Sequence, residues 1–276
     1  MERIMIVDML NMYYRAYIVD PSLSSNGKTI KEYKEGRKPI RLNRNIRNLS
    51  EEQELQNKIW QQLRLAEYIN NMPLSQIMID FTEADDVIAA LCNFHKEEDK
   101  VIVSSDKDFF QLLDDTTVLY RPVQKEVMNK NRVTDKFLIH PNNFALARAI
   151  AGDKSDNLPG VGGAGLKTIA KKFPDMCNEE TYTIKRLLSD CEKVENKLKI
   201  HNAIIEKKEL IEKNYKVMQL YTPSISTATS AIIKEHIKNY PKQFARTNIR
   251  KMMIEDGFGE MNWSDLFSSL NKIHRG

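Results

Sequence analysis

The stretch VIVSSDKDF at residues 101–109 decides the fold, because an apolar run leads directly into carboxylates. The three β-branched residues at 101–103 are typical of a buried strand. Asp106 and Asp108 follow within a few residues. In open α/β sheets, ligands bind beyond the carboxyl ends of the strands. The pattern therefore predicts a polar site at one edge of a sheet.

Three further apolar runs extend this pattern. Residues 4–7 precede Asp8, residues 77–79 precede Glu83, and residues 118–120 form a fourth strand candidate. Strands that alternate with helical stretches predict an α/β domain with a mostly parallel central sheet flanked by helices. From about residue 144 onward the pattern is almost entirely helical.

Composition narrows the class of protein. Apolar residues make up 41% and charged residues 29% of the 276 residues, which is typical of a globular protein. Lys plus Arg number 42 and Asp plus Glu 38, so the net charge is +4, which alone is a weak sign of a nucleic-acid partner. The start of the chain predicts neither a signal peptide nor a membrane span.

The cysteines and histidines argue against a His/Cys metal centre. Cys92, Cys177 and Cys191 do not stand at metal-ligand spacing, and the five histidines are scattered. Three cysteines cannot pair fully, so we expect a reduced intracellular setting, cytoplasmic or nucleoid-associated.

Carboxylates gather in clusters that suit a hard divalent cation. Crowded carboxylates are costly unless a cation neutralises them. Two ions about 3.5–4 Å apart can activate a water and stabilise the leaving oxygen in phosphodiester hydrolysis. Each cluster alone is better explained by a helix cap or a solvated loop, but together they favour a metal site. The candidate ligands are Asp8, Glu83, Asp85, Asp86, Asp106, Asp108, Asp153 and Asp156.

A glycine-rich turn, LPGVGGAGLKT at residues 158–168, follows the last acidic cluster. Glycines let the backbone approach a ligand closely, and a helix beginning near Gly165 would direct free N–H groups at a phosphate. The turn resembles a helix-hairpin-helix phosphate clamp, which grips a nucleic-acid backbone without reading sequence. A purely structural connection between two helices is the alternative. The candidate contacts are Gly160, Gly162, Gly163, Gly165, Lys167 and Lys171.

Residues 28–47 carry eight basic residues against two acidic ones, a local charge of 8 − 2 = +6. Gly36 and Pro39 argue against one unbroken helix there. The stretch predicts a nucleic-acid-binding segment, and a solvated basic face is the alternative. The candidate contacts are Lys31, Tyr33, Lys34, Arg37, Lys38 and Arg41.

The motifs together resemble the 5′-nuclease family, which includes flap endonucleases, the 5′ nuclease domain of bacterial DNA polymerase I and phage 5′→3′ exonucleases such as the phage-type ribonuclease H. The resemblance rests on Asp8 after the first strand, EADD at 83–86, SSDKDF at 104–109 and GDKSDNLPGVGGAG at 152–165, in that order. It covers most of residues 1–215. It implies a PIN-like nuclease core at 1–143 with an arch at 28–70, a helix-hairpin-helix DNA-binding region at 144–215 and a C-terminal helical extension at 216–276.

The resemblance also implies roles for single residues. Asp8, Glu83 and Asp85 match ligands of a first metal with Asp86 in support, and Asp106, Asp108, Asp153 and Asp156 match a second cluster. Lys34 and Arg37 match residues that touch the scissile phosphate, and Tyr33 matches one that stacks on a base. The implied cofactors are two Mg²⁺ ions, with Mn²⁺ as a substitute, and a K⁺ ion at the hairpin turn. The implied partners are DNA with a 5′ flap, duplex end or junction, RNA/DNA hybrids, and a replication clamp or single-strand-binding protein, but no membrane.

One departure from the family opens an alternative. The family's strand with a Trp-Asp-Gly-like motif, whose Asp is another first-metal ligand, is absent between Gly27 and Lys28. We expect a divalent-metal-dependent 5′→3′ exonuclease or flap endonuclease acting in DNA replication or repair. A catalytically weakened DNA junction-binding protein is the alternative that this departure motivates. A PIN-type ribonuclease is a third hypothesis, and the glycine turn and arch argue against it.

Overall fold

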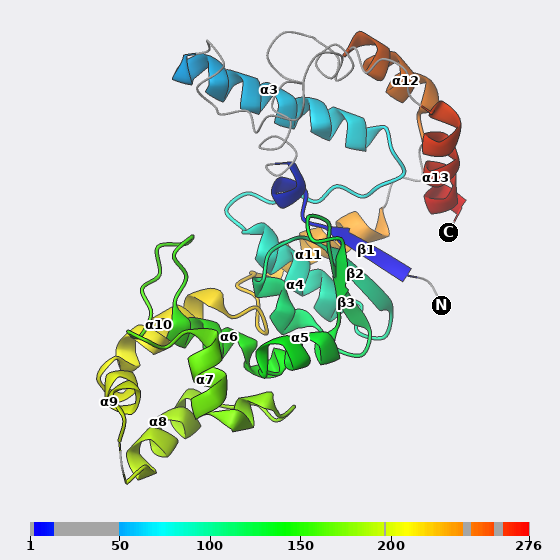
Figure 1. Ribbon diagram of the computed structural model, residues 1–276. Helices are drawn as coiled ribbons and strands as arrows, with labels where there is room; N and C mark the ends of the chain where they lie inside the picture. Colours follow the sequence, from blue (N-terminus) through cyan, green and yellow to red (C-terminus); the bar gives the residue numbers. More distant parts are fainter. Residues whose placement is uncertain (1–2, 14–49, 196, 240–243, 257–261, 276) are drawn as a thin grey trace. The chain divides into compact units, whose positions relative to one another are not determined.

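The computed structural model describes most of the chain (Figure 1). The described residues are 3–13, 50–195, 197–239, 244–256 and 262–275. The arch candidates lie outside this part: Lys31, Tyr33, Lys34, Arg37, Lys38 and Arg41. Their roles therefore stay predictions.

The chain divides into two compact units. The first comprises Met1–Asp8 and Phe81–Ser226, and the second comprises Met9–Asp80 and Thr227–Gly276. All acidic candidates and the glycine turn belong to the first unit.

The first unit is built on a four-stranded, mostly parallel sheet in the order β1-β2-β3-β4. β1 (Arg3–Val7), β2 (Asp99–Val103) and β3 (Thr117–Arg121) are parallel, and β4 (Glu126–Met128) runs antiparallel to β3. The predicted α/β class and three of the four predicted strands are confirmed. In this register Val7 lies opposite Val103, so β1 and β2 end at the same edge.

The predicted strand at residues 77–79 was wrong. The segment has no strand assignment, and Met78 is 83% exposed. An apolar run becomes a strand only when neighbouring backbone groups pair with it. Every strand pairing of the described sheet joins two of the strands β1 to β4, and residues 77–79 take part in none. The short apolar pattern could not reveal that its partner was missing.

Helices complete the first unit and confirm the helical reading of the chain after residue 144. In chain order they are α4 (Ala84–Phe94), the 3-10 helix η3 (Asp108–Leu112), α5 (Lys130–Phe137), α6 (Pro141–Ala151), α7 (Leu166–Lys172), the 3-10 helix η4 (Pro174–Cys177), α8 (Ile184–Lys193), α9 (Lys199–Glu206) and α10 (Lys208–Met218).

The centre of this unit is the almost wholly apolar helix α6, which packs against η3 and α10. Phe144 of α6 meets Phe110 of η3 and Phe137 of α5 edge-on, with ring centroids 5.3 and 5.4 Å away. One continuous hydrophobic core runs from the sheet through α6 to the helices beyond it. The predicted division between a nuclease core at 1–143 and a DNA-binding region at 144–215 therefore stays a proposal about what each part does.

The second unit is helical in its described part. It contains α3 (Glu51–Asn70), α11 (Thr227–Lys238), α12 (Arg246–Glu255) and α13 (Trp263–Arg275). Arg64 Nε and Tyr68 OH of α3 donate hydrogen bonds of 2.8 and 2.6 Å to Asp256, which follows α12. No described helix combines the length and the apolar character that crossing a membrane would need.

Lys100 in β2 is a buried structural cation, only 1% exposed. Its ammonium group donates to the carbonyl oxygens of His95 and Glu98, at 2.6 and 2.8 Å. A third hydrogen bond, of 2.7 Å, reaches Thr116 Oγ1 just before β3. The side chain thus joins the end of α4 to the start of the sheet.

We expect Lys100→Ala to lower the free energy of unfolding by about 3 kcal/mol, because it leaves buried acceptors without donors. Chemical denaturation measures the change. Lys96→Ala is the matched control, since the Lys96 side chain is exposed. Equal stability of the two variants would show that the hydrogen bonds of the Lys100 ammonium group contribute nothing to the free energy of unfolding.

Candidate metal centre

The ends of β1 and β2 bring the first carboxylates together. Asp8 follows β1, is 7% exposed, and accepts a 3.0 Å hydrogen bond from Ser104 Oγ at the end of β2. Ser104 Oγ also accepts from the backbone N–H of Asp106, at 3.1 Å. Asp106 in turn accepts from the N–H of Asp108, at 2.9 Å. A chain of hydrogen bonds therefore links the three acids that the sequence places beyond these strands.

Helix α4 supplies the next group, and its members differ. Burial first, then the charges of Asp106 and Asp8, raise the pKa of Asp85 to about 7. The Asp85 carboxyl group therefore lies close enough to Asp8 and Asp106 to feel their charges. Glu83 is the exposed N-cap of α4 and adds to the same field. Asp86 accepts a 2.7 Å hydrogen bond from the backbone N–H of Ser224.

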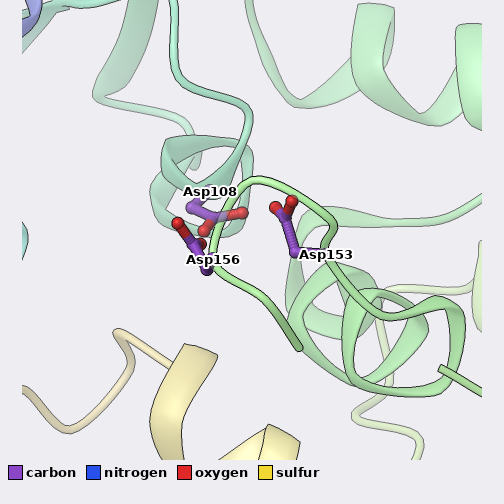
Figure 2. Close-up of side chains that lie close together, drawn as sticks. All are labelled: Asp108, Asp153 and Asp156. Atoms are coloured by element: carbon purple, nitrogen blue, oxygen red, sulfur yellow. The ribbon is translucent and has the colours of Figure 1, made fainter. Parts of the chain in front are cut away.

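The third group joins two distant segments. Asp108 begins η3, while Asp153 and Asp156 lie in the loop after α6 (Figure 2). Each offers one carboxylate oxygen, and these atoms all lie within 4.8 Å of one another. The three carboxylates gather around a common space, as Figure 2 shows.

A tight hairpin holds Asp153 and Asp156 in place. Asp153 and Leu158 exchange both backbone hydrogen bonds, at 2.8 and 2.7 Å. Gly152, directly before Asp153, has φ +76°. It faces Gly160 so closely that an added Cβ would stand 2.3 Å from Gly160 N. Only glycine allows this approach.

Arg148 is a site residue that sequence reasoning missed. From the last turn of α6, its Nε donates to Asp108 Oδ1 at 2.9 Å and its Nη2 pairs with Asp153. The signal in the sequence was that Arg148 is the one charged residue of the helix PNNFALARAIA. That helix leads directly into the acidic loop.

The pKa values of the three carboxyl groups are shifted in different directions. Burial and the charge of Asp106 raise the pKa of Asp108 to about 6, although Arg148 opposes the shift. Burial also raises the pKa of Asp156, with Asp153 adding to it. Burial would raise the pKa of Asp153 too, but hydrogen bonds from Ser155 and the Arg148 charge hold it below its usual value. Asp108 and Asp156 therefore disfavour their negative charge, whereas Asp153 keeps its charge more readily than an ordinary carboxyl group.

The residues fit a hard divalent cation. Carboxylate oxygens are the ligands that Mg²⁺ and Mn²⁺ prefer, and three of them stand close enough to share an ion. The guanidinium of Arg148 already pairs with Asp108 and Asp153, so this place attracts positive charge.

The raised pKa values predict how stability without metal depends on pH. The ordinary carboxyl pKa is near 4, whereas that of Asp85 is about 7 and that of Asp108 about 6 in the folded chain. The fold therefore favours the protonated acids, and ionisation penalises it increasingly as pH rises from about 4 to 7. We expect Asp85→Asn to stabilise the metal-free protein more at pH 8 than at pH 5.

Urea denaturation in EDTA at both pH values measures this difference. A stabilisation of the same size at pH 5 and pH 8 would contradict it. Adding Mg²⁺ at pH 8 should stabilise the unsubstituted protein more than the variant, because the cation relieves the same repulsion.

The glycine turn connects α6 and α7 as expected, and Gly165 is the N-cap of α7. Gly162 and Gly163 are exposed, and a Cβ added at either would meet no atom within 4 Å. Gly160 instead packs at the base of the acidic hairpin. Lys167 and Lys171 are exposed on α7. The turn therefore presents backbone and positive charge, while its phosphate-binding role stays a proposal.

Comparisons with known proteins show which family this chain is similar to. The family described as "5'-3' exonuclease, N-terminal resolvase-like domain" matches residues 24–138. A 5'-3' exonuclease of Aquifex aeolicus (strain VF5) is 37% identical over 145 residues, covering 51% of this chain and 46% of the relative. The thermostable DNA polymerase I of Thermus aquaticus is 32% identical over 132 residues, covering 47% of this chain and 15% of the relative.

Solved structures agree on the fold. A T5 5'-exonuclease with bound zinc matches with a TM-score of 0.62 and 20% identity, covering 87% of this chain and 98% of that one. A bacteriophage T5 flap endonuclease in a pseudo-enzyme-product complex with DNA and metal ions has a TM-score of 0.61 and 19% identity, covering 86% and 98%.

The family model and the curated relatives support a 5′ nuclease family as the group that this chain resembles. Its matched part spans about half the length of the 5'-3' exonucleases it resembles, 46% and 54% for two of them.

Proposed function

We propose that the chain is a structure-directed 5′ nuclease that hydrolyses phosphodiester bonds at DNA 5′ ends or flaps with the help of divalent cations. The convergence of Asp108, Asp153 and Asp156 on one space carries the proposal. The similarity to relatives that bear the name 5'-3' exonuclease suggests the reaction class. A related structure holds DNA and metal ions. A place in DNA replication or repair follows from the same relationship.

The acids would hold two Mg²⁺ or Mn²⁺ ions. When bound, the ions lower the pKa of water and stabilise the charge on the leaving oxygen. The proposed first set is Asp8, Glu83 and Asp85, and the proposed second set is Asp106, Asp108, Asp153 and Asp156.

The chain's own residues position these ligands. Ser104 orients Asp8 through its hydroxyl. Arg148 fixes Asp108 and Asp153. Asp86 supports the first set indirectly, because its bond to Ser224 anchors the first turn of α4.

The glycine turn would bind the phosphates of the DNA. The exposed Gly162 and Gly163 leave room for a phosphate to reach the backbone, and Lys167 and Lys171 lie on the following helix. A K⁺ ion at this turn is part of the proposal. The arch candidates Lys34, Arg37 and Tyr33 would act on the scissile strand.

A labelled 5′-flap substrate titrated with Mg²⁺ tests the proposal. We expect 5′ cleavage products that rise with Mg²⁺, that Mn²⁺ also supports, and that EDTA abolishes. Tight binding without product at any concentration of either ion would reject the nuclease. It would support the junction-binding alternative, which the absent strand between Gly27 and Lys28 favours.

The substrate range is tested with the same assay. Matched flaps with a DNA or an RNA 5′ strand annealed to DNA show whether RNA/DNA primers are cut. Cleavage confined to single-stranded RNA would favour a PIN-type ribonuclease. A replication clamp or single-strand-binding protein as partner remains a proposal from the family.

A further inference from the structure

Helix α10 is bonded to both segments that carry the metal-ligand candidates. It presents Ile211, Asn214 and Met218 as its buried face, and it packs against α6 (Figure 1). Asn214 is polar but only 1% exposed. A buried amide is retained at low cost only where its hydrogen bonds are made, so its partners are informative.

Asn214 closes the base of the acidic hairpin. Its Nδ2 donates to Ala149 O at 3.0 Å, on the α6 side, and to Pro159 O at 2.9 Å, on the far side. Ala149 O is one of the carbonyls that the end of α6 leaves without a helical partner. One amide group thus links the segment before Asp153 to the segment after Asp156.

The other end of α10 is tied to the segment that carries Asp108. Gln111 belongs to η3, which Asp108 begins, and is 5% exposed. Its Nε2 donates to Met218 O at 3.0 Å, and its Oε1 accepts from Leu220 N at 2.7 Å.

We infer that α10 is a brace that sets the separation between Asp108 and the Asp153–Asp156 hairpin. Asn214 and Gln111 are then positioning residues for cation binding, although neither reaches the ligand oxygens. The inference deepens the proposed function and rests on it. A cation needs its ligands at fixed distances, so loosening either end of the brace weakens binding.

Mn²⁺ titration of the full chain by calorimetry tests the brace. We expect Asn214→Ala and Gln111→Ala each to weaken Mn²⁺ binding about tenfold, as loss of groups that orient metal ligands does elsewhere. Loss of the hydrogen bonds at either end of α10 frees the same two segments to move apart. The Mn²⁺ affinity of the double variant should therefore also fall about tenfold, not the hundredfold that independent effects would give. Asn214→Ser keeps one donor and should fall between Asn214→Ala and the unsubstituted chain.

Asn143 provides the matched control. It is a fully buried amide on α6 whose Nδ2 donates to Met176 O, Asn178 O and Glu180 O, away from the acidic loop. Asn143→Ala should lower thermal stability as Asn214→Ala does, yet leave Mn²⁺ affinity unchanged. Equal loss of affinity in both variants would show that general destabilisation is the cause, and would overturn the brace.

The outcomes separate the brace from the function on which it rests. If the unsubstituted chain and Asp153→Asn bind Mn²⁺ alike, the metal site itself is wrong. If Asp153→Asn loses binding but Asn214→Ala and Gln111→Ala do not, only the brace is wrong. Should Asn214→Ala fail to fold, Asn214→Ser and Gln111→Ala carry the same test, and unchanged affinity in both would overturn it.

Discussion

Replacing Asp153 with Asn should lower the rate of flap cleavage by on the order of a thousandfold, because a metal centre contributes several kcal/mol to phosphoryl chemistry. Asp153 is one of the three carboxylates that share the site, and it also pairs with Arg148. Asn keeps the size of the side chain but removes the charge. Single-turnover cleavage of a labelled 5′ flap in Mg²⁺ measures the effect.

DNA binding should survive the same change. Fluorescence anisotropy in EDTA should give a dissociation constant as low as that of the unsubstituted chain, because Asp153 repels phosphate and does not attract it. Asp135→Asn is the control for the loss of one acid, since Asp135 is exposed on α5. Cleavage by Asp153→Asn at the rate of Asp135→Asn would remove the second cluster from the mechanism.

Gly160→Ala should lower the free energy of unfolding by about 3 kcal/mol, the range of a badly overpacked site. A Cβ at this position would stand 2.0 Å from Ala151 O and 2.7 Å from Gly152 N. Both are backbone atoms, so no side chain can move aside. Relief requires opening the hairpin that carries Asp153 and Asp156, and cleavage should therefore fall together with stability.

Gly162→Ala is the matched control in the same turn. No atom lies within 4 Å of the added Cβ, so stability should stay close to that of the unsubstituted chain. Gly162 is nevertheless a proposed phosphate contact, and its DNA affinity should fall. Urea denaturation and anisotropy on both variants separate the two roles, and equal stability of the two would contradict the packing argument.

Local patterns were enough to predict the sheet and the acids at its edge. β2 ends in three β-branched residues, and Asp106 and Asp108 follow within a few positions, so their place beyond the strand depends on local sequence. The helix opening at Glu83 and the turn before Gly165 were local as well. Such features depend on a few neighbouring residues, and those are visible in a single chain.

The missed features depend on contacts between distant segments. Asn214 bonds with Ala149 and Pro159 across 65 and 55 residues, and Gln111 with Leu220 across 109. Nothing in the sequence around Asn214 distinguishes it from a solvated polar residue on a charged helix. The failed strand at 77–79 has the same cause, because a strand is defined by its partner.

Anomalous diffraction from crystals of the full chain grown with Mn²⁺ tests the account most directly. We predict a strong anomalous peak within coordination distance of Asp108, Asp153 and Asp156, with the Arg148 guanidinium displaced from Asp153. Peaks found elsewhere, with Arg148 still paired to both acids, would contradict the claim that these carboxylates form a cation site.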